Sequence, residues 1–226
     1  MKILAIETST DGCSVALWRS DAPLAELFEL APRRQTERIL PMVEQLLTEQ
    51  RIAPSEITGI AVGHGPGAFT GVRIAISVAQ GLAYGLAVPV VPVSSLAASA
   101  LGAVNEGAQG KVLVAQDARM QEVYWGLYAA EEGLVHPLQP DQLVPVAALP
   151  QLPQAVTCAV GSAQLEYPEA VAALQIERWF APSYPKASAV ARLAVPVFAA
   201  GQAIPAEQLE PVYLRQNIAT PSTKKP

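Results

Sequence analysis

Histidine and cysteine are scarce in this chain. Among 226 residues there are two histidines, His64 and His136, and two cysteines, Cys13 and Cys158, far apart in the sequence. No group of histidine, cysteine and acidic residues has metal-site spacing, and no serine has the GxSxG spacing of a hydrolase nucleophile. Two isolated cysteines indicate a reducing compartment rather than a disulfide framework. These absences argue against a metalloenzyme, a serine hydrolase and a disulfide-rich domain.

Positive charge is also limited, because 15 Lys and Arg stand against 20 Asp and Glu, a net charge of −5. The basic clusters are Arg33 and Arg34 with Arg38, and Lys224 with Lys225. Proteins that hold nucleic acid unaided need clustered basic residues for the phosphates, so direct contact with nucleic acid is not expected. The sequence shows neither a signal-peptide pattern nor an unbroken apolar run of membrane-spanning length, so we expect a cytoplasmic protein without membrane association.

What the chain does have is apolar residues, at 51% of the total, and an internal repeat. The sequence KILAIET at residues 2–8 is followed by a polar turn and a second apolar run. After the polar stretch 105–110 the pattern restarts, with KVLVAQD at residues 111–117 and another apolar run at 122–128. A repeated pattern of this kind indicates a duplicated unit. We predict two units, residues 1–105 and 106–216, and a disordered tail at 217–226.

Hydrophobic periodicity predicts the elements of each unit. We expect strands at residues 2–6, 13–18, 24–30, 57–62, 88–93, 111–117, 122–128, 143–148 and 156–160, and helices at 36–51, 94–103, 167–174 and 187–201. The strand at 88–93 carries two prolines, which indicates a sheet edge or a strand end.

A glycine-rich loop organises the first unit. Gly63, Gly65, Gly67 and Gly71 join the strand to a helix predicted to run from about Gly71 to residue 86, with Thr70 as its N-cap. The spacing matches neither GxxxxGK[ST] nor a full GxGxxG pattern, and no lysine follows the loop. A tight packing turn is therefore favoured over a phosphate-binding loop, and whether a nucleotide binds there stays open.

The helix after this loop is apolar nearly all round. Ile74, Val78 and Leu82 form a stripe between small residues, and Arg73 is its one charged residue. Such helices are normally buried on more than one side, so this helix is also a candidate surface for docking another helix.

Polar residues lie at the ends of the repeated strands, where they could take part in chemistry. Glu7 and Asp117 each end the first strand of a unit and could face a metal or phosphate across a cleft, although capped turns are favoured. Gln116, not an acid, lies opposite Glu7 in the repeat. His64 could be a general base, but a loop histidine bonded to backbone is favoured because no orienting partner is apparent. For Asp117 and Arg119 with Glu122 and Tyr124, a hairpin salt bridge is favoured, and no catalytic, cofactor-binding or metal-binding residue is assigned.

Four segments together resemble one family: IETST at residues 6–10, GPGAFTGVRI at 65–74, DAR at 117–119 with EVY at 122–124, and PVYLR at 211–215. They resemble the TsaB (YeaZ) family of bacterial tRNA threonylcarbamoyladenosine biosynthesis proteins. The resemblance implies an α/β fold of two repeated actin/Hsp70-like (RNase H-like) units, with mixed sheets flanked by helices. It also implies a non-catalytic scaffold that binds the catalytic subunit TsaD and the ATPase TsaE. Together these proteins transfer a threonylcarbamoyl group to N6 of adenosine 37 in ANN-decoding tRNAs.

The resemblance also bears on individual residues. Two metal-binding histidines of TsaD line up with Ser95 and Ser99, whose hydroxyls do not bind iron or zinc as imidazole does. Gln35 stands where related proteins often have a histidine. No cofactor is therefore expected on this chain alone, and ATP and metal are expected on the partner subunits. tRNA is expected to be contacted only through the complex.

TsaD is expected to bind through the N-terminal helices, and the isolated chain to form a homodimer through the same face. The predicted interface residues are Ile39, Val43, Leu46, Arg73, Ile74, Val78 and Leu82. The alternative function is a stand-alone actin/Hsp70-like ATPase or sugar kinase, for which Gly161 and Ser162 are the candidate adenosine-binding pair.

Overall fold

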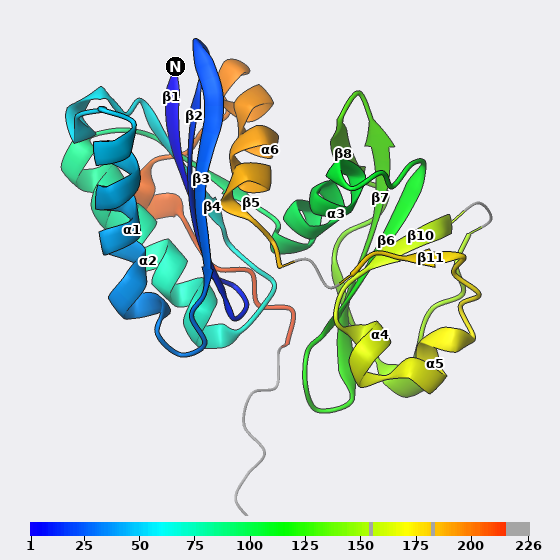
Figure 1. Cartoon of the computed structure of the whole chain (residues 1–226). Helices are drawn as coiled ribbons and strands as arrows, with labels where there is room; N and C mark the ends of the chain where they lie inside the picture. Colours follow the sequence, from blue (N-terminus) through cyan, green and yellow to red (C-terminus); the bar gives the residue numbers. More distant parts are fainter. Residues whose placement is uncertain (154–155, 182–183, 216–226) are drawn as a thin grey trace, which may run out of the picture.

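The computed structural model describes residues 1–153, 156–181 and 184–215 (Figure 1). The predicted disordered tail lies outside these residues. The first unit contains a five-stranded sheet of order β3-β2-β1-β4-β5. β1 pairs antiparallel with β2 and parallel with β4, so the sheet is mixed. Its strands are β1 (Lys2–Glu7), β2 (Gly12–Arg19), β3 (Ala22–Leu30), β4 (Gly59–Gly63) and β5 (Val90–Val93).

The second unit repeats this arrangement, with the order β11-β10-β6-β7-β8 and with β9 also paired to β7. β6 is central like β1, antiparallel to β7 and parallel to β10. The predicted duplication and the α/β fold class of two mixed sheets flanked by helices are confirmed. The strands are β6 (Lys111–Asp117), β7 (Glu122–Glu131), β8 (Leu134–Pro137), β9 (Gln142–Pro145), β10 (Val156–Val160) and β11 (Arg178–Trp179).

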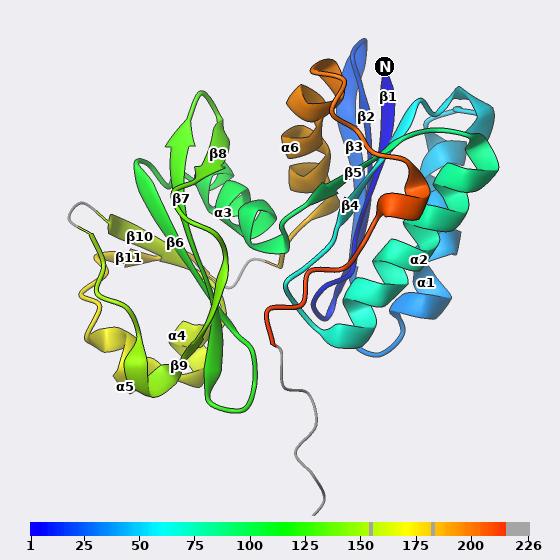
Figure 2. The same ribbon diagram turned by 180° about the vertical axis from the view of Figure 1, so that it is seen from behind.

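Some helices lie between the two sheets and others cover their outer faces (Figures 1 and 2). α1 and α2 pack on one face of the first sheet and α6 on the other, whereas α3 packs on the second sheet and α4 on the opposite face of that sheet. The helices are α1 (Gln35–Glu49), α2 (Phe69–Leu86), α3 (Ser95–Asn105), α4 (Ala163–Glu166), α5 (Pro168–Ala172) and α6 (Ala187–Ala199). Short 3-10 turns lie at η1 (Pro54–Glu56), η2 (Val146–Ala148) and η3 (Ala206–Gln208). Within the parts that are described, no helix is both long enough and apolar enough to cross a membrane.

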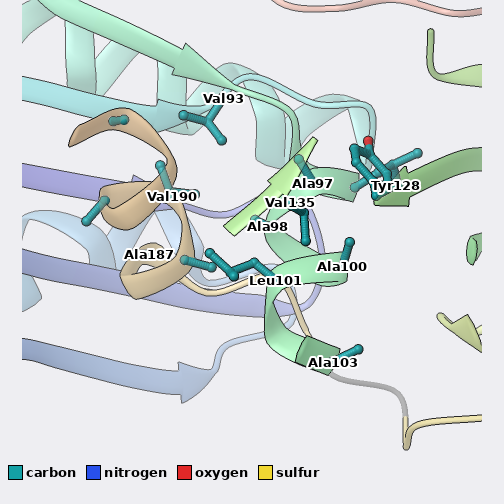
Figure 3. Packing of buried hydrophobic residues seen from close by; sticks show 14 of the residues in the cluster. Val93, Ala97, Ala98, Ala100, Leu101, Ala103, Tyr128, Val135, Ala187 and Val190 are labelled. Atoms are coloured by element: carbon teal, nitrogen blue, oxygen red, sulfur yellow. The ribbon is translucent and has the colours of Figure 1, made fainter. Parts of the chain in front are cut away.

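The last helix of each unit packs between the units. α3 leaves the first sheet and contacts β6, β7 and β8, while α6 follows β11 and returns to β1, β2 and β4. Figure 3 shows the alanine-rich faces of α3 and α6 with Tyr128 and Val135 of the second sheet around them. Small side chains let these helices approach closely, so one continuous core joins the two sheets. The division at residue 105 stays a prediction, since the chain crosses between the units at α3 and again at α6.

The start of α6 is held by side chains of the first sheet. Its N-cap, Lys186, makes no side-chain cap bond. Instead, the Ala187 N–H donates to Ser14 Oγ at 3.0 Å and the Ser188 N–H donates to Glu26 Oε1 at 2.8 Å. Ser14 Oγ also donates to Glu26 Oε1 at 3.1 Å. β2 and β3 thus satisfy the free N–H groups that a helix start leaves unpaired.

Two local predictions about α2 were wrong. The helix begins at Phe69 rather than Gly71, and its N-cap is Ala68, so Thr70 is already helical and caps nothing. The reason is tertiary: the Ala68 N–H donates to Ser9 O at 2.7 Å, which fixes the loop before the helix. The chain also covers only one side of α2, and Phe69, Arg73 and Tyr84 are exposed.

Two further elements differ in detail. The strand predicted at residues 143–148 is β9 followed by the 3-10 turn η2, and the helix predicted at 167–174 is the shorter α5. The strand with two prolines, β5, lies at the sheet edge as predicted.

Candidate functional site

The glycine loop packs directly on the turn that follows β1. A Cβ added at Gly67 would lie 2.5 Å from Ser9 O, and one at Gly71 would lie 2.1 Å from Thr8 O. Thr8 Oγ1 donates to Gly71 O at 2.7 Å. Gly63, where β4 ends, has equally little room, because a Cβ there would lie 1.8 Å from Glu7 Oε2. Close packing therefore accounts for glycine at these three positions.

Glu7 is a buried carboxylate at the end of β1, only 1% exposed. Its Oε1 accepts from the Ser9 N–H at 2.5 Å and its Oε2 accepts from Ser95 Oγ at 2.8 Å. Burial raises the pKa of Glu7, and its hydrogen bonds oppose that rise. Glu7 therefore points into the first unit and not toward solvent, which differs from the solvated turn favoured by its sequence.

The two serines that line up with metal-binding histidines, Ser95 and Ser99, are buried and make hydrogen bonds inside the protein. Ser95 is 1% exposed and its hydroxyl donates to Glu7; Ser99 is 3% exposed and its hydroxyl donates to Ser95 O at 3.1 Å. The described residues include no group of three or more His, Cys, Asp or Glu placed to hold a metal ion. Ser95 and Ser99 do not fit a metal. Gln35, similarly, ties α1 to the same turn by donating to Thr10 O at 2.9 Å.

Asp117 ends β6 in a capped turn, as favoured by its sequence, but its side chain is 7% exposed and not solvated as expected. Its Oδ1 accepts from the Arg119 N–H at 2.8 Å and from Tyr167 OH at 2.7 Å, and Arg119 Nη1 lies 3.2 Å from Oδ2. Ser162 Oγ accepts from the Asp117 N–H at 3.0 Å, so Ser162 of the candidate pair Gly161 and Ser162 anchors the turn. Within the described parts of the chain, Glu7 and Asp117 thus share no hydrogen-bond partner.

His64 lies half-buried at the start of the glycine loop. Its Nδ1 is 3.4 Å from Glu210 O, and burial lowers its pKa. This is the backbone-bonded histidine that the sequence favoured.

Near His64, Asp141 accepts from Ser94 Oγ and from Tyr128 OH, both at 2.5 Å, and burial raises the pKa of Asp141. These bonds tie the crossover before α3 to the second sheet.

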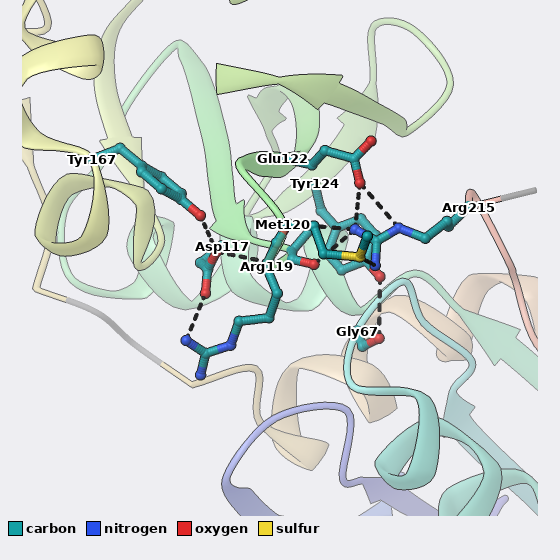
Figure 4. Close-up of polar contacts among 9 residues, drawn as sticks. Gly67, Asp117, Arg119, Met120, Glu122, Tyr124, Tyr167 and Arg215 are labelled. Atoms are coloured by element: carbon teal, nitrogen blue, oxygen red, sulfur yellow. Dashed lines mark hydrogen bonds and ion pairs between the residues drawn. The ribbon is translucent and has the colours of Figure 1, made fainter. Parts of the chain in front are cut away.

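The two units also meet at the glycine loop (Figure 4). Tyr124 OH on β7 donates to Gly67 O at 3.4 Å. Beside it, Glu122 pairs with Arg215. The sequence favoured a hairpin salt bridge within residues 117–124, and Asp117 and Arg119 form one. Glu122 lies outside that bridge, because its partner is a residue 93 positions away.

The predicted interface residues fall into two groups. Ile39, Val43 and Leu46 are 1%, 5% and 1% exposed, so this face of α1 packs against the chain's own first sheet. They were predicted as surface residues, and the structure corrects that: the apolar stripe is used internally. On α2, Arg73 is exposed, and the stripe of Ile74, Val78 and Leu82 is partly buried. The role of these four in partner binding stays a prediction.

A groove of about 560 Å³ is lined by α1, by the loop that follows α1 and by the end of α2. Leu40 of α1 stands on it with 52% of its surface exposed, and Leu82 and Leu86 of α2 line it from the other side. Glu44 and Arg51 add charge to this mostly apolar surface. An apolar groove with charged residues beside it has the composition of a helix-binding surface.

A second exposed cluster sits at the start of α2. The Arg73 guanidinium lies 3.7 Å from the centre of the Phe69 ring, and Arg73 Nε donates to Tyr213 OH at 2.7 Å. Phe69 and Tyr213 are 45% and 43% exposed. Of these three residues only Arg73 was predicted as an interface residue. Tyr213 was missed because it lies 140 residues away from Arg73 in the sequence. Exposed aromatic residues and arginine are enriched at protein interfaces.

Comparisons with known proteins give a consistent result. A family model described as TsaD, tRNA N6-adenosine threonylcarbamoyltransferase, matches residues 28–220. The Escherichia coli K12 protein named tRNA threonylcarbamoyladenosine biosynthesis protein TsaB is 40% identical over 97% of this chain and 96% of its own length. A Bacillus subtilis protein of the same name is 39% identical over 65% of this chain and 63% of its own. The structure titled "YeaZ from Pseudomonas aeruginosa" superposes with a TM-score of 0.84 at 38% identity, covering 94% of this chain and 99% of that one.

Proposed function

This chain belongs to the TsaB family of tRNA threonylcarbamoyladenosine biosynthesis proteins, and from that membership we propose that it acts in threonylcarbamoyladenosine synthesis as a non-catalytic scaffold subunit. Its partner is the catalytic subunit TsaD, joined by the ATPase TsaE. The assembly transfers a threonylcarbamoyl group to N6 of adenosine 37 in ANN-decoding tRNAs. ATP and metal are bound by the partner subunits, and tRNA is contacted through the complex.

The polar residues support a scaffold rather than a catalyst. Glu7 is buried and bonded to Ser9 and Ser95, and Asp117 is bonded to Arg119 and Tyr167. A general acid or base must reach the reacting group, and neither carboxylate is free to do so in this arrangement. The net charge of −5 also favours contact with tRNA through partners.

The observation that carries the proposal is the apolar groove between α1 and α2. Leu40 is half-exposed there, and Leu82 and Leu86 present apolar surface from α2. A helix of TsaD laid along this groove would bury these leucines. The isolated chain buries the same surface by pairing with a second copy of itself. The homodimer thus takes the place of the heterodimer.

Size-exclusion chromatography with light scattering tests the proposal, on this chain alone and mixed with TsaD from the same organism. We expect a homodimer that gives way to a 1:1 heterodimer. Leu40→Glu places a charge in the groove and should raise the dissociation constant for TsaD by roughly 30-fold or more, as for an interface residue worth at least about 2 kcal/mol. Because Leu40 is exposed, the variant should fold normally.

Leu165→Glu is the matched control, since Leu165 is also an exposed helical leucine (65%) but lies on α4 of the second unit. It should bind TsaD as the wild type does. Equal binding by both variants would exclude the groove as the interface. If the wild-type chain does not bind TsaD but hydrolyses ATP by itself, the alternative function of a stand-alone ATPase or kinase would be supported instead.

A further inference from the structure

The C-terminal segment of the described chain runs along the first unit before it reaches the second. The segment of residues 210–215 is called the strap below. Just before it, Gln80 of α2 donates to Leu209 O at 3.0 Å. Within it, the Val212 N–H donates to His64 O at 2.9 Å, and Tyr213 OH accepts from Arg73 Nε. The strap is thus fixed to the glycine loop and to the start of α2.

The strap ends in the second unit, on the turn between β6 and β7 (Figure 4). Arg215 Nε donates to Glu122 Oε2 at 3.0 Å, and Nη2 also contacts this oxygen. Arg215 Nη2 further donates to Ala118 O at 3.0 Å and to Arg119 O at 3.4 Å. The side chains of Arg215 and Glu122 are 23% and 28% exposed, so the pair is partly shielded from solvent. Charge-assisted bonds of this kind are stronger than neutral ones.

The turn that Arg215 grips has a strained backbone. Arg119, Met120 and Gln121 have φ values of +62°, +57° and +58°. Three consecutive non-glycine residues in the left-handed region cost free energy and persist only where the surroundings hold them. Arg215 bonds the carbonyl that precedes this run and the carbonyl of its first residue, so it is placed to hold the turn in that shape.

We infer that the strap holds the two units together at the glycine loop, with Arg215 as the positioning residue that holds the β6–β7 turn. Separating the units there requires Arg215 to leave Glu122 and the two carbonyls. Tyr124 must also leave Gly67, since its bond crosses the same gap. The inference concerns the two units of this chain and stands apart from the proposed binding of TsaD.

A distance measurement between the units tests this inference. Spin labels are attached at Asp21→Cys in the β2–β3 turn and Leu165→Cys on α4, both exposed positions outside the groove, in a Cys158→Ser background. The labelled protein is diluted with unlabelled chain, so that only distances within one chain are measured. Cys13 is buried, and burial raises its pKa to about 11, so it stays unlabelled in the folded protein. The wild type should give one narrow distance distribution, and Arg215→Ala a broader one shifted to longer distances.

Two further variants make the result specific. Arg38→Ala removes an arginine that bonds Glu29 at 2.6 and 2.9 Å within the first unit, and it should leave the distribution narrow. Arg215→Lys keeps the charge but not the planar fork, so it should give an intermediate width. A distribution for Arg215→Ala as narrow as that of the wild type would overturn the inference. If Arg215→Ala does not fold, the width for Arg215→Lys decides in the same way.

Amide hydrogen exchange tests whether the strap acts as one piece. In Arg215→Ala, the Val212 N–H on the first unit should exchange about tenfold faster or more, together with the Glu122 N–H of the turn. The Ile60 N–H, bonded to Pro89 O in the first sheet, should not change. Faster exchange at Glu122 with an unchanged rate at Val212 would mean two independent contacts, and the strap would be excluded.

Discussion

The attachment of α6 to the first sheet allows a quantitative prediction. α6 returns from the second unit, and its first two N–H groups end on Ser14 and Glu26. Glu26 is the acceptor shared by the Ser188 N–H and by Ser14 Oγ. Glu26→Ala removes this acceptor and leaves the Ser188 N–H unpaired at a helix start.

The size of the effect follows from these contacts. A hydrogen bond to a charged group contributes about 1.5–3 kcal/mol, and an anion at a helix N-terminus about 0.3–1 kcal/mol. The two overlap, because one carboxylate provides both, so we expect Glu26→Ala to lower the free energy of unfolding by about 2–3 kcal/mol. Glu26→Gln keeps an oxygen acceptor and loses only the charge, and should cost about 0.3–1 kcal/mol.

Urea unfolding followed by circular dichroism measures both variants, and a thermal scan should show a lower Tm for Glu26→Ala by roughly 5–10 °C. Glu37→Ala is the control, because Glu37 meets Arg34 at 3.4 Å with both side chains mostly exposed. It should stay within about 0.5 kcal/mol of the wild type. Glu26→Ala with a stability equal to that of Glu37→Ala would refute the capping role of Glu26.

Two further predictions concern Glu7 and the glycines of α2. Burial raises the pKa of Glu7 above its ordinary value of 4.5, so its contribution to stability is present below that value and is lost as pH rises through the folded-state pKa. Glu7→Gln, which still accepts from the Ser9 N–H, should therefore gain stability relative to the wild type as pH rises above 4.5 in urea titrations, and a parallel pH profile would contradict this. Gly71→Ala meets Thr8 O and should lower stability by about 1–3 kcal/mol, whereas Gly81→Ala, in open space on the same helix, should raise it by about 0.5–1 kcal/mol; equal effects in thermal unfolding would contradict the packing argument.

The sequence predicted the repeat and most strands for a clear physical reason. β1 and β6 lie in the middle of their sheets and are buried on both faces, so they read as short apolar runs at equivalent places in each unit. Pro89 and Pro92 lack a backbone donor, which confined β5 to a sheet edge. These signals depend only on neighbouring residues and could be read locally.

The sequence could not show what each apolar helix face packs against. The stripe of Ile39, Val43 and Leu46 has helical spacing whether it packs on the chain's own sheet or on a partner, and only the structure places it in the core. The link between Arg215 and Glu122 was missed for a similar reason. It joins residues 93 positions apart, and no local pattern in either segment points to the other.

Two helices with many small residues, α2 and α3, show why the groove is the stronger clue to function. α3 lies between the sheets, and most of its residues, among them Leu96, Ser99 and Leu101, are buried. α2 has similar small and apolar residues, yet the chain covers only the side with Val72 and Ala79. Apolar surface that folding leaves open on a helix is typical of an interaction site. The proposed docking of TsaD at α1 and α2 would cover this surface, and Leu40→Glu tests it directly.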